Sequence, residues 1–398
     1  MPSFRTIEDL DVNGKRVVLR ADLNVPMQDG KVSDATRVER AADTIKALLD
    51  KGAAVMVLSH FGRPKGKVVP EMSLEPVVAA LEKALDRRVT FVATDWADGK
   101  ALDAADAAVP GQVLLFENTR YHPGDEANDD VFAEQLASLG DVFVSDAFSA
   151  SHRAHASTAG IAKHLPAAAG LTMAAEIEAL EKALSTPERP VMAIVGGAKV
   201  STKIDLLSNL VEKVDMLVIG GGMANTFLAA DGHRIGTSLY EADKLDTARD
   251  IEAAAEKAGC QLVLPVDVIA AKAFEANAPH RVCGLDGVED DEMILDIGPQ
   301  TETALEHRLH QTKTVLWNGP FGAFELEPFD AGTNAVARTV ARDTKAGRML
   351  SVAGGGDTVA ALNKAGVTQD FSFVSTAGGA FLEWLEGKTL PGVDVLRP

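Results

Sequence analysis

The chain has 398 residues. At about 100 to 200 residues per domain, this length predicts two substantial domains that each bury a core. Hydrophobic residues make up 46% of the chain and charged residues 24%, which excludes a disordered or a fibrous protein. The 39 Lys and Arg against 58 Asp and Glu give a net charge of −19. That charge repels nucleic acid and acidic membranes, so a small anionic substrate needs a locally basic cleft.

The cysteine count and the N-terminal segment indicate the compartment. Cys260 and Cys283 are too few for a disulfide framework or for a structural zinc held by thiolates alone. Residues 1–9 lack the apolar core of a signal peptide, and no stretch approaches the roughly 20 apolar residues of a membrane span. The sequence therefore predicts a cytoplasmic protein.

Short apolar runs alternate with longer helical patterns along the chain, as in parallel sheets built from strand-helix-strand units. In the first half we expect strands at 16–20, 53–58, 89–92, 112–116 and 142–145, and helices at 37–50, 74–85 and 130–139. In the second half we expect strands at 191–195, 215–219, 262–266, 314–317, 348–353 and 371–374. The predicted fold is α/β, with two domains that each hold a parallel, Rossmann-like sheet between helix layers.

The domain boundary is predicted where a helical pattern over 172–184 runs into the segment 185–190 and a new apolar strand follows. A proline-bounded segment is a stop signal for a helix, although an ordinary helix-strand loop fits the same pattern. We expect a first domain over 1–170, a linker helix and hinge over 171–190, a second domain over 191–385 and a tail over 386–398.

In open parallel sheets, ligands bind beyond the carboxyl ends of the strands. Four strand ends of the first half are followed by polar and basic residues: Asp22, Asn24 and Arg37; His60 and Arg63; Arg120; and Asp146, His152, Arg153 and His155. A single arginine is more often a solvated surface charge, but four converging strand ends favour a phosphate and carboxylate site. We interpret the histidines as hydrogen-bond donors or structural groups, with proton transfer as the weaker alternative.

The strand ends of the second half carry glycine instead, at 196–197, 220–222, 319 and 322, 354–356 and 378–379. Glycine at a strand-to-helix turn lets backbone amides approach a ligand, and the helix start favours negative charge. Tight turns also use glycine, but five such runs in one domain predict a nucleotide site.

The usual nucleotide signatures are incomplete. The Gly387-Lys388-Thr389 run lacks the first glycine of a P-loop, because Leu382 stands there. The dinucleotide fingerprint fails at Asn225 and Val359, where a glycine or alanine is needed. A nicotinamide-dependent dehydrogenase is therefore the weaker hypothesis.

Three charged residues of the second half are candidates for phosphate and metal binding. Lys199 and Lys203 stand four residues apart at the predicted start of a helix, a spacing that places both on one face. Cations are unfavourable at a helix N-terminus, so we expect an anion there, with a solvated lysine pair as the alternative. Asp357 follows three glycines and is a candidate Mg2+ ligand, with a helix N-cap as the alternative.

Seven segments, in order and over essentially the whole chain, resemble phosphoglycerate kinase. They are Arg20–Pro26, Ser59–Pro64, Glu117–Arg120, His152–Ser157, Gly197–Val200, Trp317–Pro320 and Gly354–Thr358. The resemblance implies an N-terminal domain for 3-phosphoglycerate or 1,3-bisphosphoglycerate, a C-terminal domain for Mg-ADP or Mg-ATP, and a C-terminal tail that returns to the first domain. The implied reaction is glycolytic: reversible, direct in-line phosphoryl transfer from 1,3-bisphosphoglycerate to ADP, with domain closure and with Mg2+ as cofactor.

The family's site residues are carried over by position. The resemblance implies a glycerate-phosphate site of Asp22, Leu23, Asn24, Arg37, His60, Phe61, Gly62, Arg63, Arg120 and Arg153. It implies a nucleotide site of Gly197, Lys203, Gly221, Asn318, Glu325, Gly354, Gly355, Gly356, Asp357, Thr358 and Gly378, with Glu325 at the ribose and Asp357 at the magnesium. Ala377 departs from the family's more usual glycine, which affects only an amide contact that needs a positive φ.

The expected catalytic residues are Arg37, Lys199 and Lys203, because a carboxylate nucleophile has no proton to lose and needs no general base. The rival is a non-catalytic nucleotide-binding regulator, which would have lost Arg37, Lys199, Lys203 or Asp357, and none of them is lost. We expect small-molecule substrates, no nucleic-acid or membrane partner, and a monomer.

Overall fold

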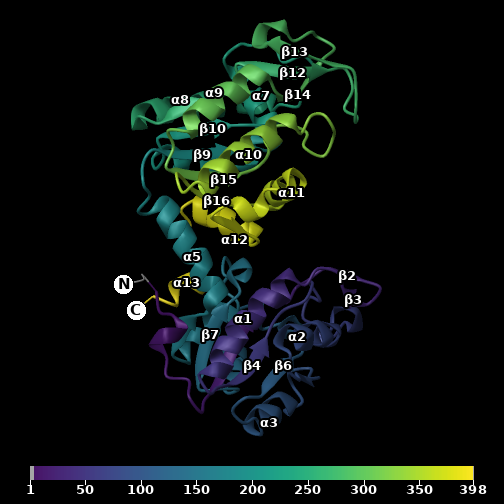
Figure 1. The fold of residues 1–398 in the computed structure, drawn as a ribbon. Helices are drawn as coiled ribbons and strands as arrows, with labels where there is room; N and C mark the ends of the chain where they lie inside the picture. The colour runs from purple at the N-terminus through teal and green to yellow at the C-terminus, as the bar shows by residue number, and fades with distance from the viewer. Residues whose placement is uncertain (1–3, 398) are drawn as a thin grey trace. The chain divides into compact units, whose positions relative to one another are not determined.

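The computed structural model describes residues 4–397, which form two compact units (Figure 1). Unit 1 comprises Met1–Glu178 and Thr389–Pro398, and unit 2 comprises Ala179–Lys388. The division falls inside α5 (Leu171–Leu184). The C-terminal segment is part of unit 1, where the Gly392 N–H donates to the Ser151 carbonyl at 2.9 Å. A Cβ at residue 392 would lie 2.8 Å from the Ser151 Cα, so this contact requires a glycine.

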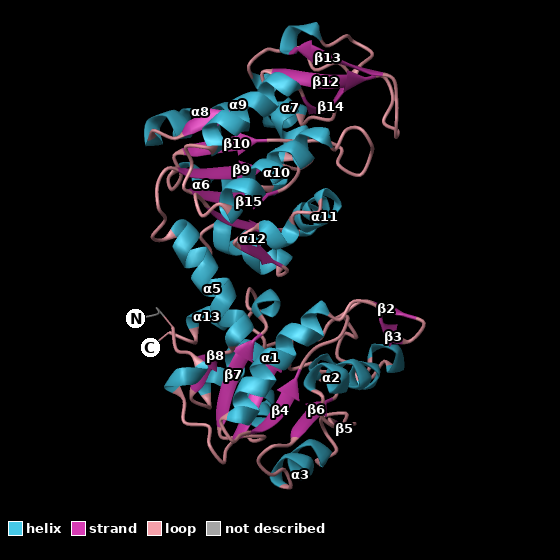
Figure 2. Cartoon of the chain, viewed as in Figure 1, coloured by secondary structure: helices cyan, strands magenta, loops and turns pink. Residues whose placement is uncertain are grey.

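Unit 1 is built on a six-stranded parallel sheet with the order β5-β6-β4-β1-β7-β8 (Figure 2). Its strands are β1 (Arg16–Ala21), β4 (Ala54–Leu58), β5 (Thr90–Val92), β6 (Val113–Phe116), β7 (Val142–Asp146) and β8 (Ala167–Ala169). Its helices are α1 (Thr36–Asp50), α2 (Val78–Leu85), α3 (Lys100–Asp106), α4 (Asp130–Ala137) and α13 (Pro391–Asp394), and β2 (Met27–Gln28) pairs with β3 (Lys31–Val32).

Both faces of this sheet are covered: successive side chains of a strand point to opposite faces, and all five residues of β4 are buried. Val17 and Leu19 of β1 pack in one core cluster with Val38 of α1. Phe116 of β6 belongs to a separate aromatic group, in which its ring centroid lies 6.2 Å from that of Trp96. With both faces covered, the loops at the carboxyl edge of the sheet remain for ligand binding.

Unit 2 holds a second six-stranded parallel sheet with the order β11-β10-β9-β15-β16-β17. Its strands are β9 (Val191–Val195), β10 (Met216–Ile219), β11 (Gln261–Val263), β15 (Thr314–Asn318), β16 (Leu350–Gly354) and β17 (Phe373–Ser375). Its helices are α6 (Ile204–Val211), α7 (Gly222–Ala230), α8 (Leu245–Ala258), α9 (Pro299–Leu309), α10 (Ala331–Lys345), α11 (Gly356–Ala365) and α12 (Gly378–Leu385). The predicted fold class, two parallel sheets flanked by helices, is confirmed.

The structure corrects two sequence-based expectations in unit 2. A separate antiparallel sheet of β12 (Asp267–Ala271), β13 (His280–Gly284) and β14 (Met293–Ile297) was not predicted. The helix expected to start at Lys199 starts only at Ile204. A short turn over Val200–Thr202 precedes it, so Lys199 and Lys203 flank this turn and do not share a helix face.

Candidate functional site

The loops at the carboxyl edge of the unit 1 sheet are tied together by amide side chains. The Asn118 Oδ1 accepts hydrogen bonds from the backbone N–H groups of Phe61, at 3.2 Å, and Arg120, at 3.1 Å. The Asn24 Oδ1 accepts from the Gly62 N–H at 3.0 Å. The loops after β1, β4 and β6 are thus held in one arrangement.

Arg37 lies in the first turn of α1 and points to the loop after β1. Its Nη1 forms an ion pair with Asp22 at 3.1 Å and donates to the Asn24 carbonyl at 2.9 Å. The Ser149 hydroxyl donates to the same carboxylate, at the Asp22 Oδ2, at 2.5 Å. These contacts orient the guanidinium of a side chain that is 31% exposed. Leu23, between the two loop residues, is fully buried and supports the loop with its side chain.

His60 is held in its neutral form. The fully buried Arg20 donates from Nη2 to the His60 Nδ1 at 3.0 Å. Burial and the charges of Arg20 and Arg120 hold the pKa of His60 well below its usual value. Because arginine only donates, the Nδ1 is an acceptor and the ring proton is assigned to Nε2. The arrangement supports the interpretation of His60 as a hydrogen-bond donor to a ligand.

Three arginines form a cationic cluster at this edge. Arg120 is partly buried and donates to the Gly62 carbonyl at 2.9 Å. Its pKa is lowered, first by burial, against the attraction of Glu126 and Asp125, and further by the charges of Arg63 and Arg153. Within residues 4–397, the exposed guanidinium groups of Arg63 and Arg153 donate to no protein acceptor. Three guanidinium groups close enough to disfavour one another, two of them without a protein acceptor, are suited to a multiply charged anion.

In unit 2, the strand order reverses between β9 and β15, and two backbone segments meet there. The Gly196 N–H donates to the Asn318 carbonyl at 3.0 Å. A Cβ on Gly196 would lie 1.9 Å from the Pro320 oxygen, and one on Gly319, at φ +108°, would lie 2.1 Å from the Gly196 oxygen. Only glycine permits this approach. Ligands of open parallel sheets bind at such a switch point.

Lys203 reaches into the same point from the start of α6. Its ammonium donates to the Gly196 carbonyl at 2.6 Å, to the Asn318 Oδ1 at 2.6 Å and to the Asn318 carbonyl at 3.2 Å. Burial lowers the pKa of Lys203 to about 8, against the opposing attraction of Asp357. The sequence pattern placed Lys203 at the site but did not show that it is buried.

The loop after β16 carries the other predicted residues of the nucleotide site. The Asn318 Nδ2 donates to the Gly354 carbonyl at 2.8 Å, and the Thr358 hydroxyl accepts from the Gly319 N–H at 2.7 Å. Asp357 is exposed and, in the described chain, accepts no hydrogen bond from the protein. Ala377 precedes Gly378 at the start of α12 with φ −96°, so the alanine meets no backbone restriction.

Beside this point lies a cavity of about 260 Å³ in unit 2. Four predicted residues line it: Gly197, Gly221, Glu325 and Asp357. The lining does not include Lys199, Lys203, Asn318, Gly354, Gly355, Gly356, Thr358 or Gly378. Sequence reasoning missed much of its apolar lining, including Leu239, Phe274, Met293, Leu295 and Phe324, which comes partly from the antiparallel sheet that was not predicted.

Among residues 4–397, no group of three or more His, Cys, Asp or Glu side chains is arranged to hold a metal ion. None of the helices in that range is both long and apolar enough to cross a membrane.

Two parallel sheets, one with a cationic cluster and the other with a glycine-bounded cavity, define a two-domain α/β protein whose sheet edges are suited to anionic ligands. The family model of phosphoglycerate kinase matches residues 7–388. The chain is 61% identical over 398 residues to the phosphoglycerate kinase of Methylobacterium radiotolerans, covering 100% of this chain and 99% of that protein. It is 58% identical over 397 residues to that of Agrobacterium fabrum, with coverage of 100% and 99%.

Solved structures agree with these relatives. The phosphoglycerate kinase of Coxiella burnetii superposes with a TM-score of 0.93 at 46% identity, over 99% of this chain and 98% of that one. The enzyme of Pyrococcus horikoshii superposes with a TM-score of 0.81 at 29% identity, over 98% of both chains. The chain belongs to the phosphoglycerate kinase family. It is a glycolytic kinase, which transfers a phosphoryl group between 1,3-bisphosphoglycerate and ADP.

Proposed function

We propose that unit 1 binds the glycerate phosphate, unit 2 binds the nucleotide, and the phosphoryl group passes directly between them in line. The observation that carries this proposal is the cluster of Arg63, Arg120 and Arg153, two of which have no protein acceptor in the described chain. A phosphate group supplies the acceptors that these guanidinium groups lack. The neutral His60 and the oriented Arg37 then face the carboxylate end of the substrate.

Catalysis in this proposal rests on positioning and charge. The nucleophile is the C1 carboxylate of 3-phosphoglycerate, which attacks the terminal phosphorus of ATP while the bond from that phosphorus to the ADP oxygen breaks. No proton is transferred, so no general base is needed. Arg37, Lys199 and Lys203 supply positive charge around the migrating group. Lys199 is exposed and, among residues 4–397, donates to no protein acceptor.

The residues of unit 2 fit a magnesium ion that is held jointly with the nucleotide. Asp357 lines the cavity, and no protein donor in the described residues occupies its carboxylate. Mg2+ at nucleotides takes one or two carboxylates together with phosphate oxygens and water. When bound, the ion neutralises charge on the phosphate oxygens. Asp357 is the proposed ligand, and Glu325 at the cavity is the proposed ribose contact.

We propose that residues 1–170 and 191–385 act as the two substrate domains, that 171–190 serve as the hinge, and that the tail 386–398 supports the first domain. The protein is further proposed to act as a cytoplasmic monomer on small molecules alone. The net charge of −19 supports the absence of a nucleic-acid partner.

The proposal is tested by ATP formation from 1,3-bisphosphoglycerate and ADP, with and without Mg2+. We expect ATP and 3-phosphoglycerate only when Mg2+ is present. Full activity in excess EDTA would contradict the role of Asp357. An absorbance change with a nicotinamide cofactor would favour a dehydrogenase, and nucleotide binding without turnover would favour a regulatory protein.

A further inference from the structure

One wall of the unit 2 cavity is formed by β14, a strand at the edge of the small antiparallel sheet. Its residues 293–296 line the cavity, and within this sheet it pairs only with β12. The pairing is irregular, because Ile269 lies opposite Asp296 and Ala270 opposite Ile294, which leaves Leu295 out of the ladder. A bulge of this kind disrupts the ladder locally and redirects a side chain. The wall therefore depends on contacts that β14 makes outside its own ladder.

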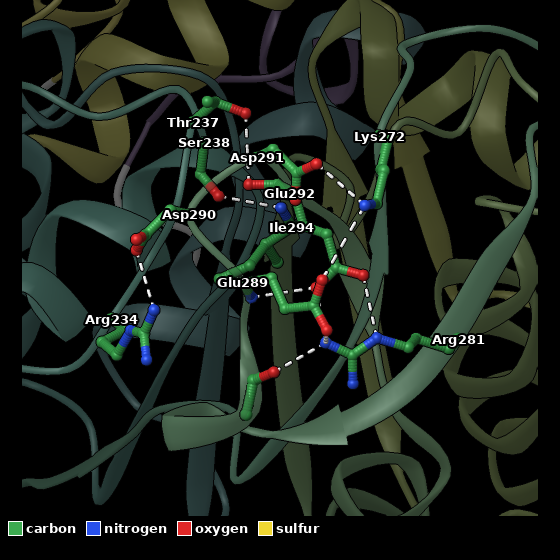
Figure 3. A network of polar contacts seen from close by, with 11 residues as sticks. Arg234, Thr237, Ser238, Lys272, Arg281, Glu289, Asp290, Asp291, Glu292 and Ile294 are labelled. Atoms are coloured by element: carbon green, nitrogen blue, oxygen red, sulfur yellow. Dashed lines mark hydrogen bonds and ion pairs between the residues drawn. The ribbon is translucent and has the colours of Figure 1, made fainter.

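Glu292 directly precedes β14 and makes several of these contacts (Figure 3). Its carboxylate accepts two hydrogen bonds from Arg281 on β13, from Nε at 2.8 Å and from Nη2 at 2.6 Å. It also accepts from the Glu289 N–H at 2.9 Å. The Glu292 side chain is 5% exposed and that of Arg281 is 41% exposed. The bidentate pair fixes the orientation of a carboxylate that is almost completely buried.

The backbone of residues 292–294 is held to residues 236–238 by hydrogen bonds. The Glu292 carbonyl accepts from the Thr237 N–H at 2.8 Å and from its hydroxyl at 3.1 Å. The Ile294 N–H donates to the Ser238 hydroxyl oxygen at 2.8 Å. At Gly236, with φ +54°, a Cβ would lie 2.1 Å from the Glu292 oxygen, so the two segments approach as closely as glycine permits.

The segment 236–238 and the strand β14 both lead to residues of the cavity lining. Leu239, which follows the joined segment, lines the cavity, and its carbonyl accepts from the Asn225 Nδ2 at 3.0 Å. On the other side, the carbonyl of the bulged Leu295 accepts from the Ala323 N–H at 2.8 Å. Ala323 belongs to the cavity loop that carries Glu325. A shift of β14 would therefore move three parts of the cavity lining together: β14 itself, Leu239, and the loop of Ala323 and Glu325.

We propose that Arg281 and Glu292 are positioning residues, which set the affinity for the nucleotide by holding the β14 wall without touching the ligand. This rests on the proposed function, in which the nucleotide occupies the unit 2 cavity. Neither residue lines the cavity. The pair lowers the pKa of Glu292 and raises that of Arg281, so both groups stay ionised through the neutral range.

Other ion pairs of the same network provide matched controls. Arg234 pairs with Asp290 at 2.7 Å, with side chains 56% and 94% exposed. Lys272 pairs with Asp291 at 2.8 Å, with side chains 61% and 65% exposed. Exposed pairs of this kind contribute little. The Arg234→Gln and Lys272→Gln variants should therefore leave the KM for the nucleotide unchanged.

The test uses the full-length chain and steady-state kinetics with Mg-ATP and 3-phosphoglycerate. Glu292→Gln and Arg281→Gln should each raise the KM for Mg-ATP about tenfold, within the range of coupling energies for contacting residues. The kcat and the KM for 3-phosphoglycerate should stay within about twofold, since unit 1 is untouched. The double variant should be about as impaired as either single variant, because the two residues act as one pair.

Three results would overturn the proposal. One is an unchanged KM for Mg-ATP in both single variants. Another is a parallel loss of kcat and of affinity for both substrates with a lowered Tm, which would show a purely structural role. The third is a double variant whose impairment is the product of the two single effects. Arg281→Gln keeps the test usable if Glu292→Gln does not fold, because Arg281 is the more exposed partner.

A cavity-filling variant separates this proposal from the proposed function. Ala323→Trp introduces a large ring at a residue of the cavity lining, and it keeps the backbone N–H that donates to the Leu295 carbonyl. If Ala323→Trp raises the KM for Mg-ATP and the Arg281 and Glu292 variants do not, the positioning role fails alone. If Ala323→Trp folds and leaves that KM unchanged, the nucleotide does not occupy this cavity, and the proposed site itself fails.

Discussion

Lys203 donates two hydrogen bonds to a single residue, Asn318, one to its side-chain oxygen at 2.6 Å and one to its backbone carbonyl at 3.2 Å. Asn318 in turn donates to the Gly354 carbonyl at 2.8 Å. The ammonium group thus stands where the loops after β9, β15 and β16 meet. All three of its N–H groups are engaged by the protein, so a phosphate that binds here must replace or share these acceptors.

This geometry predicts that nucleotide binding is linked to proton uptake. Burial lowers the pKa of Lys203 to about 8, from an ordinary value above 10, so the free enzyme loses this proton as the pH rises through about 8. A phosphate anion favours the ammonium form and raises the pKa again. Binding should therefore take up nearly one proton at pH 9 and almost none at pH 7.

Calorimetric titration in two buffers with different heats of ionisation measures this uptake. The Lys203→Arg variant is the control, because its guanidinium stays charged at both pH values. If Lys203→Arg takes up as many protons at pH 9 as the unchanged protein does, another group takes the proton.

Replacement of Arg37 should affect turnover more than binding. Its guanidinium is oriented by Asp22 and by the Asn24 carbonyl, and the proposal places its charge beside the migrating group. Arg37→Ala should lower kcat by roughly 100- to 1,000-fold, as for the loss of one preorganised donor. Lys46→Ala, an exposed position on the same helix, should have no effect. An unchanged kcat with a raised KM for 3-phosphoglycerate would assign Arg37 to substrate binding instead.

His60 should act identically at pH 6 and at pH 8. Its pKa is held well below 6.5 by burial and by Arg20 and Arg120, so the ring stays neutral over this range. His60→Ala should raise the KM for 3-phosphoglycerate about tenfold or more, the effect of losing a hydrogen bond to a charged group. The KM for 3-phosphoglycerate should rise by the same factor at pH 6 and at pH 8. His164→Ala is the control, and a factor that changes severalfold with pH would mean that His60 titrates in this range.

Most strands of the two parallel sheets could be predicted from short apolar runs, although β8, a strand of three buried alanines, was not predicted. All five residues of β4 and of β9 are buried, and each of these strands is a short apolar run. By contrast, β13 alternates between exposed and half-buried residues and contains Arg281 and Cys283, so it gave no apolar run. β12 of the same sheet was also missed, although all five of its residues are buried.

The candidate site was predicted where it follows strand ends and missed where it depends on packing between distant segments. Arg63, Arg120 and Arg153 each follow a strand, so chain order alone placed them at one edge. Leu239 and Leu295 are 56 residues apart and carry no motif, and only the folded chain brings them to one cavity. Similarly, nothing in the local pattern separates a helix that starts at Lys199 from the turn that precedes Ile204.

We expect the two units to close on their ligands. The proposed glycerate-phosphate site belongs to unit 1 and the proposed nucleotide site to unit 2, and in-line transfer needs reacting atoms about 3 to 3.5 Å apart. Water must also be excluded, because an exposed phosphoryl group would pass to solvent. Each ligand alone supplies only part of the closing contacts, so neither should shift the equilibrium as far as both together. Small-angle scattering should therefore give the smallest radius of gyration in the ternary complex with 3-phosphoglycerate and a non-reacting Mg-nucleotide. The same radius in the free, binary and ternary states would rule out closure as a required step, and it would leave the residue assignments to be judged by the variants above.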